Sequence, residues 1–221
     1  MASSIFVYNL LPSAPQIATV VYETLNSIPD DETSYFNMQL LSDSELSGEY
    51  VTVQTVEETF YNAAQRSFEQ RQAQRASVVY FNIYNNRLEV WGNKTSANRL
   101  VFTISTAFQN RISINAIEVS IEGIISKLQD YKVKVSKVCF EDFLFTEDIV
   151  GNFTVDLSSY GDAFSVLNKY KEKISRMTII LSCNGMALKI SISSKGTIMV
   201  YKSRDSFDED ALDTLHAILL K

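Results

Sequence analysis

The sequence predicts an α+β fold made of antiparallel, curved β-sheets with helices packed on one face. Three observations lead to this prediction. Only 7 of the 221 residues are glycine and 3 are proline, so most of the chain is expected in regular elements. Short runs of alternating apolar residues are joined by turns such as Asn85-Asn86, as in antiparallel hairpins. Segments with apolar residues at helical spacing follow some of these hairpins and begin near capping residues.

The first quarter of the chain predicts three strands and one helix. Ser4–Leu10 alternates as a strand and ends before two prolines, which cannot continue a sheet. Gln16–Ile28 carries apolar residues at helical spacing. Tyr35–Leu41 and Glu49–Val56 have the pattern of strands, and the polar stretch Ser42–Gly48 between them resembles a turn.

Residues 57–76 are polar and basic without a clear apolar face. As a helix, this region would place Arg71 and Arg75 four residues apart, which is a mildly repulsive spacing. As two strands, it would form a projecting hairpin arm with Arg71, Ala73 and Arg75 on one face. The hairpin is favoured, because the region leads directly into a β-rich run.

From Val78 onward the patterns are clearer. Val78–Tyr84 and Arg87–Trp91 predict a hairpin, and Thr95 or Ser96 is expected to cap the helix that follows. The remaining elements are expected as strands at residues 112–119, 133–145, 152–157, 177–183, 187–193 and 197–202, and as helices at residues 121–131, at residues 162–174 and after Ser206 or Asp208.

A unit of two strands and a capped helix occurs twice and aligns over about 30 residues. The two copies begin with Phe81-x-Ile83, turn, Leu88-x-Val90-Trp91 and with Ile190-x-Ile192, turn, Ile198-x-Val200-Tyr201. Chance similarity is the alternative, since any two such units look alike at this level. A true repeat would make residues 77–221 a pseudo-symmetric domain that resembles, as a fold analogy only, proteins built like the TATA-binding protein. No motif links the chain to that family.

The chain is therefore divided into an acidic N-terminal region with a basic hairpin arm, residues 1–76, and an α+β domain, residues 77–221. One continuous domain is the alternative. Charge is unevenly distributed, because no Lys or Arg precedes Asn62, whereas residues 62–138 hold eleven basic and five acidic residues. We expect the acidic quarter to neutralise the basic middle within the fold. The alternative is that one segment contacts a charged partner.

No catalytic constellation is recognisable in the sequence. His216 is the only histidine and is expected to be structural, and Cys139 and Cys183 lie too far apart for a paired motif. Adjacent carboxylates are expected to be solvated, and no glycine-rich phosphate loop is present. We predict no cofactor, no metal ligands and no catalytic residues. No apolar run approaches the roughly 18 residues of a membrane span, so a cytoplasmic protein without membrane contact is expected.

The leading functional hypothesis is a non-catalytic binding or interaction module, acting as an accessory or regulatory subunit in a bacterial or phage system. Its partner is expected to be a protein or a second copy of the chain. The first alternative is a nucleic-acid-binding accessory protein, although the sequence pI of about 4.9 opposes it. The second is a metal-dependent hydrolase. The residues expected to contact nucleic acid or a partner are Arg66, Arg71, Arg75, Arg87, Trp91, Lys94 and Arg99.

Overall fold

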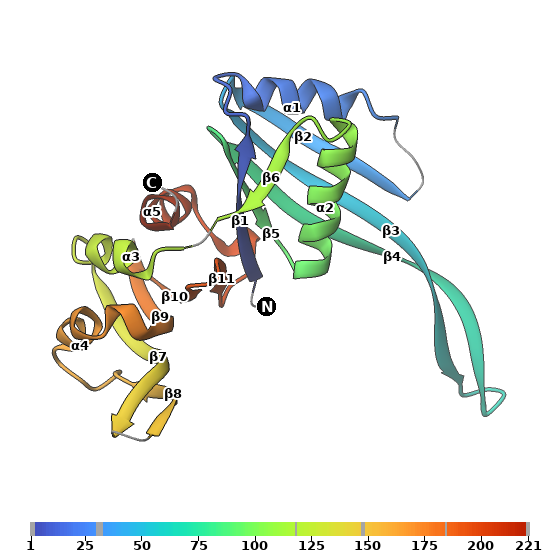
Figure 1. Cartoon of the computed structure of the whole chain (residues 1–221). Helices are drawn as coiled ribbons and strands as arrows, with labels where there is room; N and C mark the ends of the chain where they lie inside the picture. The colour runs from blue at the N-terminus through green and yellow to red at the C-terminus, as the bar shows by residue number, and fades with distance from the viewer. Residues whose placement is uncertain (1–2, 30–32, 118, 147–148, 184, 220–221) are drawn as a thin grey trace. The chain divides into compact units, whose positions relative to one another are not determined.

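The computed structural model describes residues 3–29, 33–117, 119–146, 149–183 and 185–219. Within these ranges the chain has an α+β fold with an antiparallel sheet of eleven strands and five α-helices (Figure 1). The fold class expected from the sequence is therefore confirmed. The sheet is neither closed nor strongly curled, so the curvature that we expected is not seen.

The chain forms two compact units, which are described separately. One consists of residues 8–115, and the other of residues 1–7 together with residues 116–221. Strand β1 (Ser3–Leu11) contributes residues to both units. The division expected between residues 76 and 77 lies inside a single long strand of the first unit.

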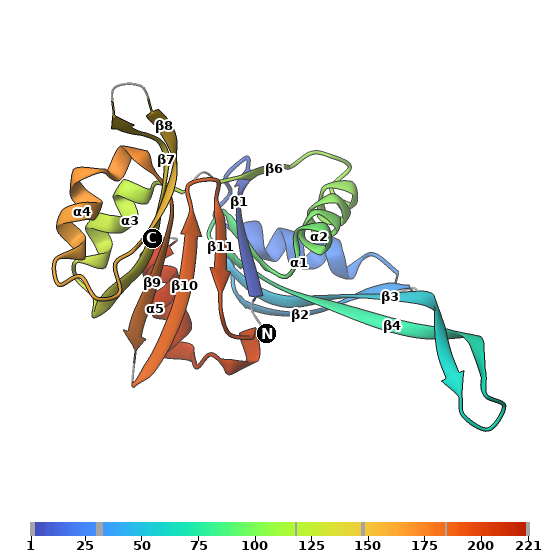
Figure 2. The same ribbon diagram turned by 90° about the horizontal axis from the view of Figure 1, so that it is seen from below.

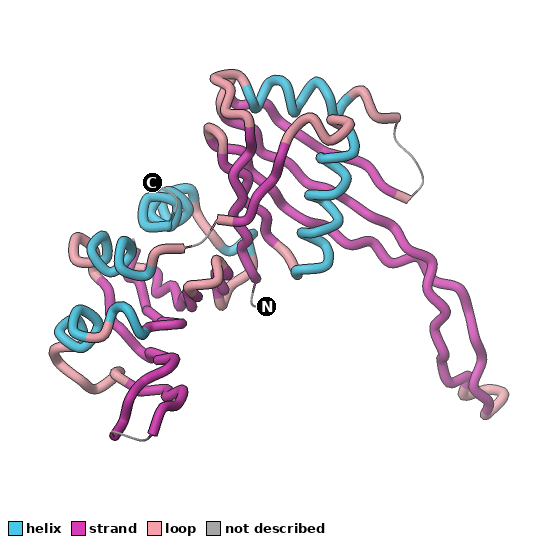
Figure 3. Tube along the Cα trace, in the orientation of Figure 1, coloured by secondary structure: helices cyan, strands magenta, loops and turns pink. Residues whose placement is uncertain are grey.

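In the unit of residues 8–115, the strand order is β2-β3-β4-β5-β1, and the short strand β6 (Ser113–Ala116) also pairs with β1. Helices α1 and α2 cover one face of these strands (Figures 1 and 3). The bounds of the other elements are β2 (Ser34–Ser42), β3 (Glu45–Asn62), β4 (Ser67–Tyr84), β5 (Arg87–Trp91), α1 (Ile17–Asn26) and α2 (Lys94–Ala107).

The polar stretch Ser42–Gly48 is mostly strand, so the turn expected there is wrong. β3 begins at Glu45, because the tight connection from β2 needs only residues 43 and 44. Gly48 is required by packing, since a Cβ atom at this position would lie 2.8 Å from the buried ring of Phe81. A glycine that looks like a turn residue in the sequence therefore serves close contact within a strand.

Helix α2 begins earlier than the sequence predicted. The N-cap is Asn93, whose side-chain oxygen accepts a hydrogen bond from the backbone N–H of Ser96 at 2.9 Å. Thr95 and Ser96 are consequently helical residues. Asn is as good a cap as Ser or Thr, and Asn93 has the extended backbone that an N-cap residue needs. Asn93 is therefore the cap, rather than Thr95 or Ser96.

In the other unit, the strand order is β1-β11-β10-β9-β7-β8, with all pairs antiparallel. Helices α3, α4 and α5 belong to this unit, and α3 contacts both other helices and β9. The bounds are β7 (Val133–Thr146), β8 (Ile149–Asp156), β9 (Ile174–Cys183), β10 (Met186–Ser193), β11 (Thr197–Val200), α3 (Ile121–Leu128), α4 (Ala163–Lys169) and α5 (Glu209–Leu219).

Two expectations for this half are corrected. The helix expected over residues 162–174 ends at Lys169, is followed by a 3₁₀ turn (Lys171–Lys173), and gives way to β9 at Ile174. The strand expected over residues 112–119 is reduced to Ser113–Ala116, and residue 118 lies outside the described residues.

Both copies of the proposed sequence repeat form two strands followed by a helix, namely β4-β5-α2 and β10-β11-α5. Asp208 caps α5 by accepting a hydrogen bond from the N–H of Ala211 at 2.7 Å, which selects it over Ser206. A structural repeat is not shown, and it stays a prediction.

Candidate binding site at the β3–β4 hairpin

β3 and β4 form one long hairpin, paired without interruption from Glu45–Tyr84 to Asn62–Ser67. β2 pairs with β3 only up to Thr52, and β5 pairs with β4 only from Tyr80 onward. Residues 55–74, here called the arm, are thus a two-stranded ribbon that extends beyond the sheet of its unit (Figure 2). The hairpin that we favoured for residues 57–76 is confirmed.

A four-residue turn, residues 63–66, closes the arm. Asn62 shapes it, since its side-chain oxygen accepts hydrogen bonds from the N–H groups of Ala64 and Gln65 at 3.1 and 3.3 Å. Arg66 has a φ of 52°, a left-handed conformation that is uncommon for arginine. These local bonds explain how a polar sequence without a glycine can turn here.

Strand alternation gives the hairpin two faces. Even-numbered residues of β3 and odd-numbered residues of β4 lie on the side of α2, as shown by the 3.3 Å hydrogen bond between the hydroxyls of Tyr50 and Thr103 in α2. We call this side the helix face and the other side the opposite face. Arg71 and Arg75 belong to the helix face, whereas Arg87 and Trp91 belong to the opposite face.

Arg71 and Arg75 share one carboxylate. Arg75 donates hydrogen bonds to Glu58 from Nε at 3.0 Å and from Nη2 at 2.8 Å, and Nη2 of Arg71 lies 3.5 Å from the other carboxylate oxygen. The hydrogen bond from Arg75 is the main reason why the pKa of Glu58 lies below its ordinary value. Arg71 also lies over the ring of Phe60, 5.1 Å from its centroid.

The end of the arm carries two exposed aromatic side chains on its opposite face. Tyr61 and Phe68 are directly paired across the strands, and their ring centroids are 5.3 Å apart. Tyr61 is 55% exposed and Phe68 is 75% exposed. Neither residue was among the site residues expected from the sequence. Placing the turn at residues 63–66 would have identified them, because that turn pairs Tyr61 with Phe68 across the two strands.

The structure separates the seven residues proposed from the sequence. Arg66 lies in the turn, and Arg71 and Arg75 come together at Glu58. Arg87 pairs with Tyr84 on the opposite face. Trp91 is only 2% exposed and donates its indole N–H to the buried carboxylate of Glu89, so it is a core residue rather than a stacking platform. Lys94 and Arg99 both belong to α2.

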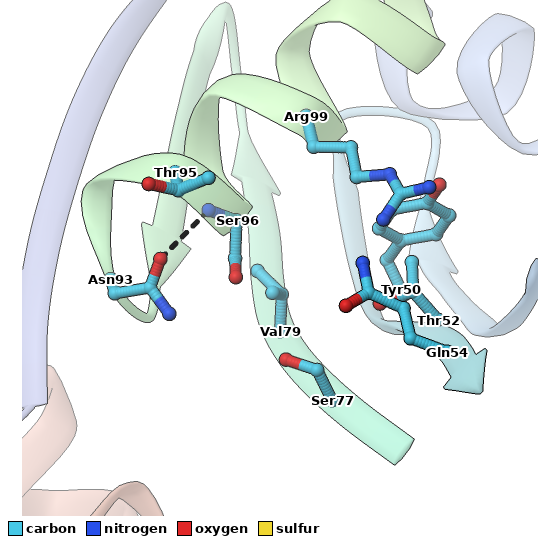
Figure 4. Close-up of a pocket in the computed structure, with 9 residues that line it drawn as sticks. All are labelled: Tyr50, Thr52, Gln54, Ser77, Val79, Asn93, Thr95, Ser96 and Arg99. Carbon is cyan, nitrogen blue, oxygen red and sulfur yellow. Dashed lines mark hydrogen bonds between the residues drawn. The ribbon is translucent and has the colours of Figure 1, made fainter. Parts of the chain in front are cut away.

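A cavity of about 430 Å³ lies on the helix face where the arm joins the sheet (Figure 4). Tyr50, Thr52 and Val79 are its buried lining residues, and Arg99 extends over it from α2. The complete lining is Tyr50, Thr52, Gln54, Ser77, Val79, Asn93, Thr95, Ser96 and Arg99. Of the seven predicted residues, only Arg99 reaches this cavity.

The described ranges contain neither a metal-binding cluster nor a membrane-spanning helix. No group of three or more His, Cys, Asp or Glu side chains there could hold a metal ion. No helix in the same ranges is long and apolar enough to cross a membrane. Neither the protein-family models nor the curated proteins give a match to this chain.

Proposed function

We propose that this chain is a non-catalytic protein-interaction module, an accessory or regulatory subunit that inserts the end of its arm into an apolar pocket of a partner protein. The observation that carries this proposal is the exposed, directly paired Tyr61 and Phe68 at the end of a two-stranded ribbon. Such a ribbon has no apolar layer to pack against, so neither ring is needed for the core of the unit.

Exposed aromatic pairs are a recognised feature of binding surfaces. Tyrosine is enriched among the residues that dominate binding energy, and a large side chain with few rotatable bonds is ordered at little entropic cost. The 5.3 Å separation of the two rings also gives them a defined arrangement before any partner arrives. Pre-ordering of this kind lowers the free-energy cost of association.

The charge of the arm favours a protein over nucleic acid. The arm and the adjoining Arg75 together contain three Glu and three Arg, so this part of the hairpin is neutral overall rather than basic. Arg71 and Arg75 are engaged by Glu58, which reduces the positive field available to a phosphate backbone. A neutral ribbon with an apolar end matches the composition of an interface core surrounded by polar residues.

Site-specific photo-crosslinking tests the proposal. A photoreactive phenylalanine analogue at Phe68 is expected to give one discrete adduct in cells of the native host, and Tyr61→Ser is expected to abolish that adduct. The matched control is the same analogue at Phe102 of α2, which is 71% exposed and outside the arm. The proposal fails if position 68 gives no adduct, or if both positions give the same adduct.

Sedimentation of the purified protein identifies self-association. Should the wild type form a dimer that the Tyr61→Ser/Phe68→Ser variant does not form, the partner is a second copy of the chain. If the purified protein is a monomer at all concentrations, the partner in the crosslinked adduct is a different protein.

A further inference from the structure

The cavity on the helix face carries a second inference, which does not depend on the proposed function of the arm. Its floor is formed by Tyr50, Thr52 and Val79, and its open side by residues of α2 and by Gln54 and Ser77 (Figure 4). Most of the lining side chains are hydroxyls or amides. Such a lining suits a small polar ligand better than an apolar one.

The charge of the lining favours an anion. Arg99 is the only cationic residue of the nine, and none of the nine is acidic. Within the described ranges, the guanidinium group of Arg99 makes no salt bridge, in contrast to Arg71 and Arg75. A chain with a net charge of −6 therefore has a cavity in which the only formal charge is positive.

A hydroxyl in the lining without a protein partner points in the same direction. Thr52 is only 7% exposed and lines the cavity, yet its hydroxyl makes no hydrogen bond to any residue that the structure describes. This oxygen is not one of the fully buried side-chain atoms that lack a partner, so water in the cavity can reach it. A ligand oxygen in the cavity would give this hydroxyl its partner.

The beginning of α2 adds backbone donors. Asn93 satisfies the N–H of Ser96, whereas the N–H groups of Lys94 and Thr95 belong to the first turn and have no acceptor within the helix. The helix dipole also places partial positive charge at this end. Arginine, hydroxyls and a helix N-terminus together are the donor set that phosphate groups use.

We propose that this cavity binds the phosphate group of a small phosphorylated molecule. Arg99 supplies the charge, Thr52 donates from the floor, and the first turn of α2 donates backbone N–H groups. The phosphate of a nucleic-acid strand presents similar oxygens, so the test includes a DNA probe.

The test is titration of the ¹⁵N-labelled protein monitored by NMR, with four probes: inorganic phosphate, ribose 5-phosphate, ribose and a single-stranded DNA 12-mer without terminal phosphate. We expect phosphate and ribose 5-phosphate to shift the amide signals of Thr95 and Ser96 saturably, whereas ribose does not. Arg99→Gln should weaken binding by about tenfold or more, because a charge-assisted hydrogen bond is lost. Thr52→Val, which keeps the shape of the side chain, should weaken binding several-fold.

Arg87→Gln is the matched control, because it removes the same charge from the opposite face. It should leave the affinity for ribose 5-phosphate unchanged. The proposal is overturned if no saturable shift occurs, if ribose alone gives the same shifts, or if Arg99→Gln and Arg87→Gln behave alike. Tighter binding of the DNA 12-mer than of ribose 5-phosphate would overturn the assignment to a small molecule.

Discussion

Glu58 lies at the centre of the charged contacts of the arm. Arg71 is paired directly opposite, and Arg75, whose own cross-strand partner is Gln54, reaches Glu58 along the same face. This arrangement explains how the acidic and basic segments of the sequence meet. The carboxylate of Glu58 is half-buried by its neighbours but reachable by water. Its ion pairs with Arg71 and Arg75 therefore fix side-chain positions more than they stabilise the fold.

The pKa of Glu58 gives the first prediction at this scale. Because the folded pKa lies below the ordinary value, the contribution of Glu58 to stability is present above the unfolded pKa and is lost as the pH falls through the folded pKa. Arg75→Gln should raise the pKa of Glu58 toward its ordinary value, and Arg71→Gln should raise it less. Titration followed by carboxyl ¹³C NMR measures both, and equal effects of the two variants would contradict the geometry.

Thr52 gives a prediction that links stability to binding. Thr52→Val removes a hydroxyl that water in the cavity can reach and that bonds to no described residue, so the free energy of unfolding of the ligand-free protein should be nearly unchanged. Thr178→Val is the matched control, because the equally buried hydroxyl of Thr178 donates to Ser191 at 3.3 Å. The control should be destabilised, as measured by urea unfolding. Destabilisation of both variants to the same extent would show that Thr52 has a partner.

Gly48 gives a packing prediction. Gly48→Ala would bring Cβ to 2.8 Å from the ring of Phe81 and 3.0 Å from Met38, and the overpacking should cost about 1–3 kcal/mol. This exceeds the roughly 0.5–1 kcal/mol that alanine gains over glycine in a strand. Gly161→Ala is the control, since no atom lies within 4 Å of its Cβ position. Urea unfolding should separate the two variants, and equal midpoints would contradict the predicted clash.

At the scale of elements, β4 is one strand with two environments. Residues 79–83 include the fully buried Phe81 and Ile83, which face α1 and α2, whereas the arm segment is paired only with β3. Two-stranded ribbons without a packed layer are marginally stable. The arm is stabilised by cross-strand pairs that contribute about 0.2–1 kcal/mol each.

Hydrogen exchange should reveal this difference. Backbone amides of residues 68–74 are expected to exchange much faster than those of residues 79–83 of the same strand, because local opening of the arm exposes no core. Exchange measured by mass spectrometry on overlapping peptides tests this. Equal protection along β4 would mean that another surface covers the arm.

At the scale of the whole molecule, the net charge of −6 and the neutral arm bear on the nucleic-acid alternative. We expect no saturable binding of labelled double-stranded DNA at moderate salt, as measured by fluorescence anisotropy. Binding that weakens steeply with salt and is lost in the Arg71→Ala/Arg75→Ala/Arg87→Ala variant would instead place nucleic acid ahead of a protein partner.

The sequence by itself determined the fold class, the types of nearly all elements and the hairpin of residues 57–76. These features depend on neighbours close in the chain, since turns, caps and alternation act over a few residues. The prediction was wrong at Ser42–Gly48 and at the cap of α2. At both places the local sequence is compatible with two structures, and the tertiary packing determines which one forms.

Only the tertiary structure decided which of the predicted site residues are available. It buried Trp91, joined Arg71 and Arg75 at Glu58, and placed Arg99 over a cavity with Thr52, 47 positions earlier in the chain. No local pattern encodes these outcomes, because each depends on the register between strands and on how a helix packs across them. That long-range packing separates the predicted arginines and leaves only Arg99 at the cavity.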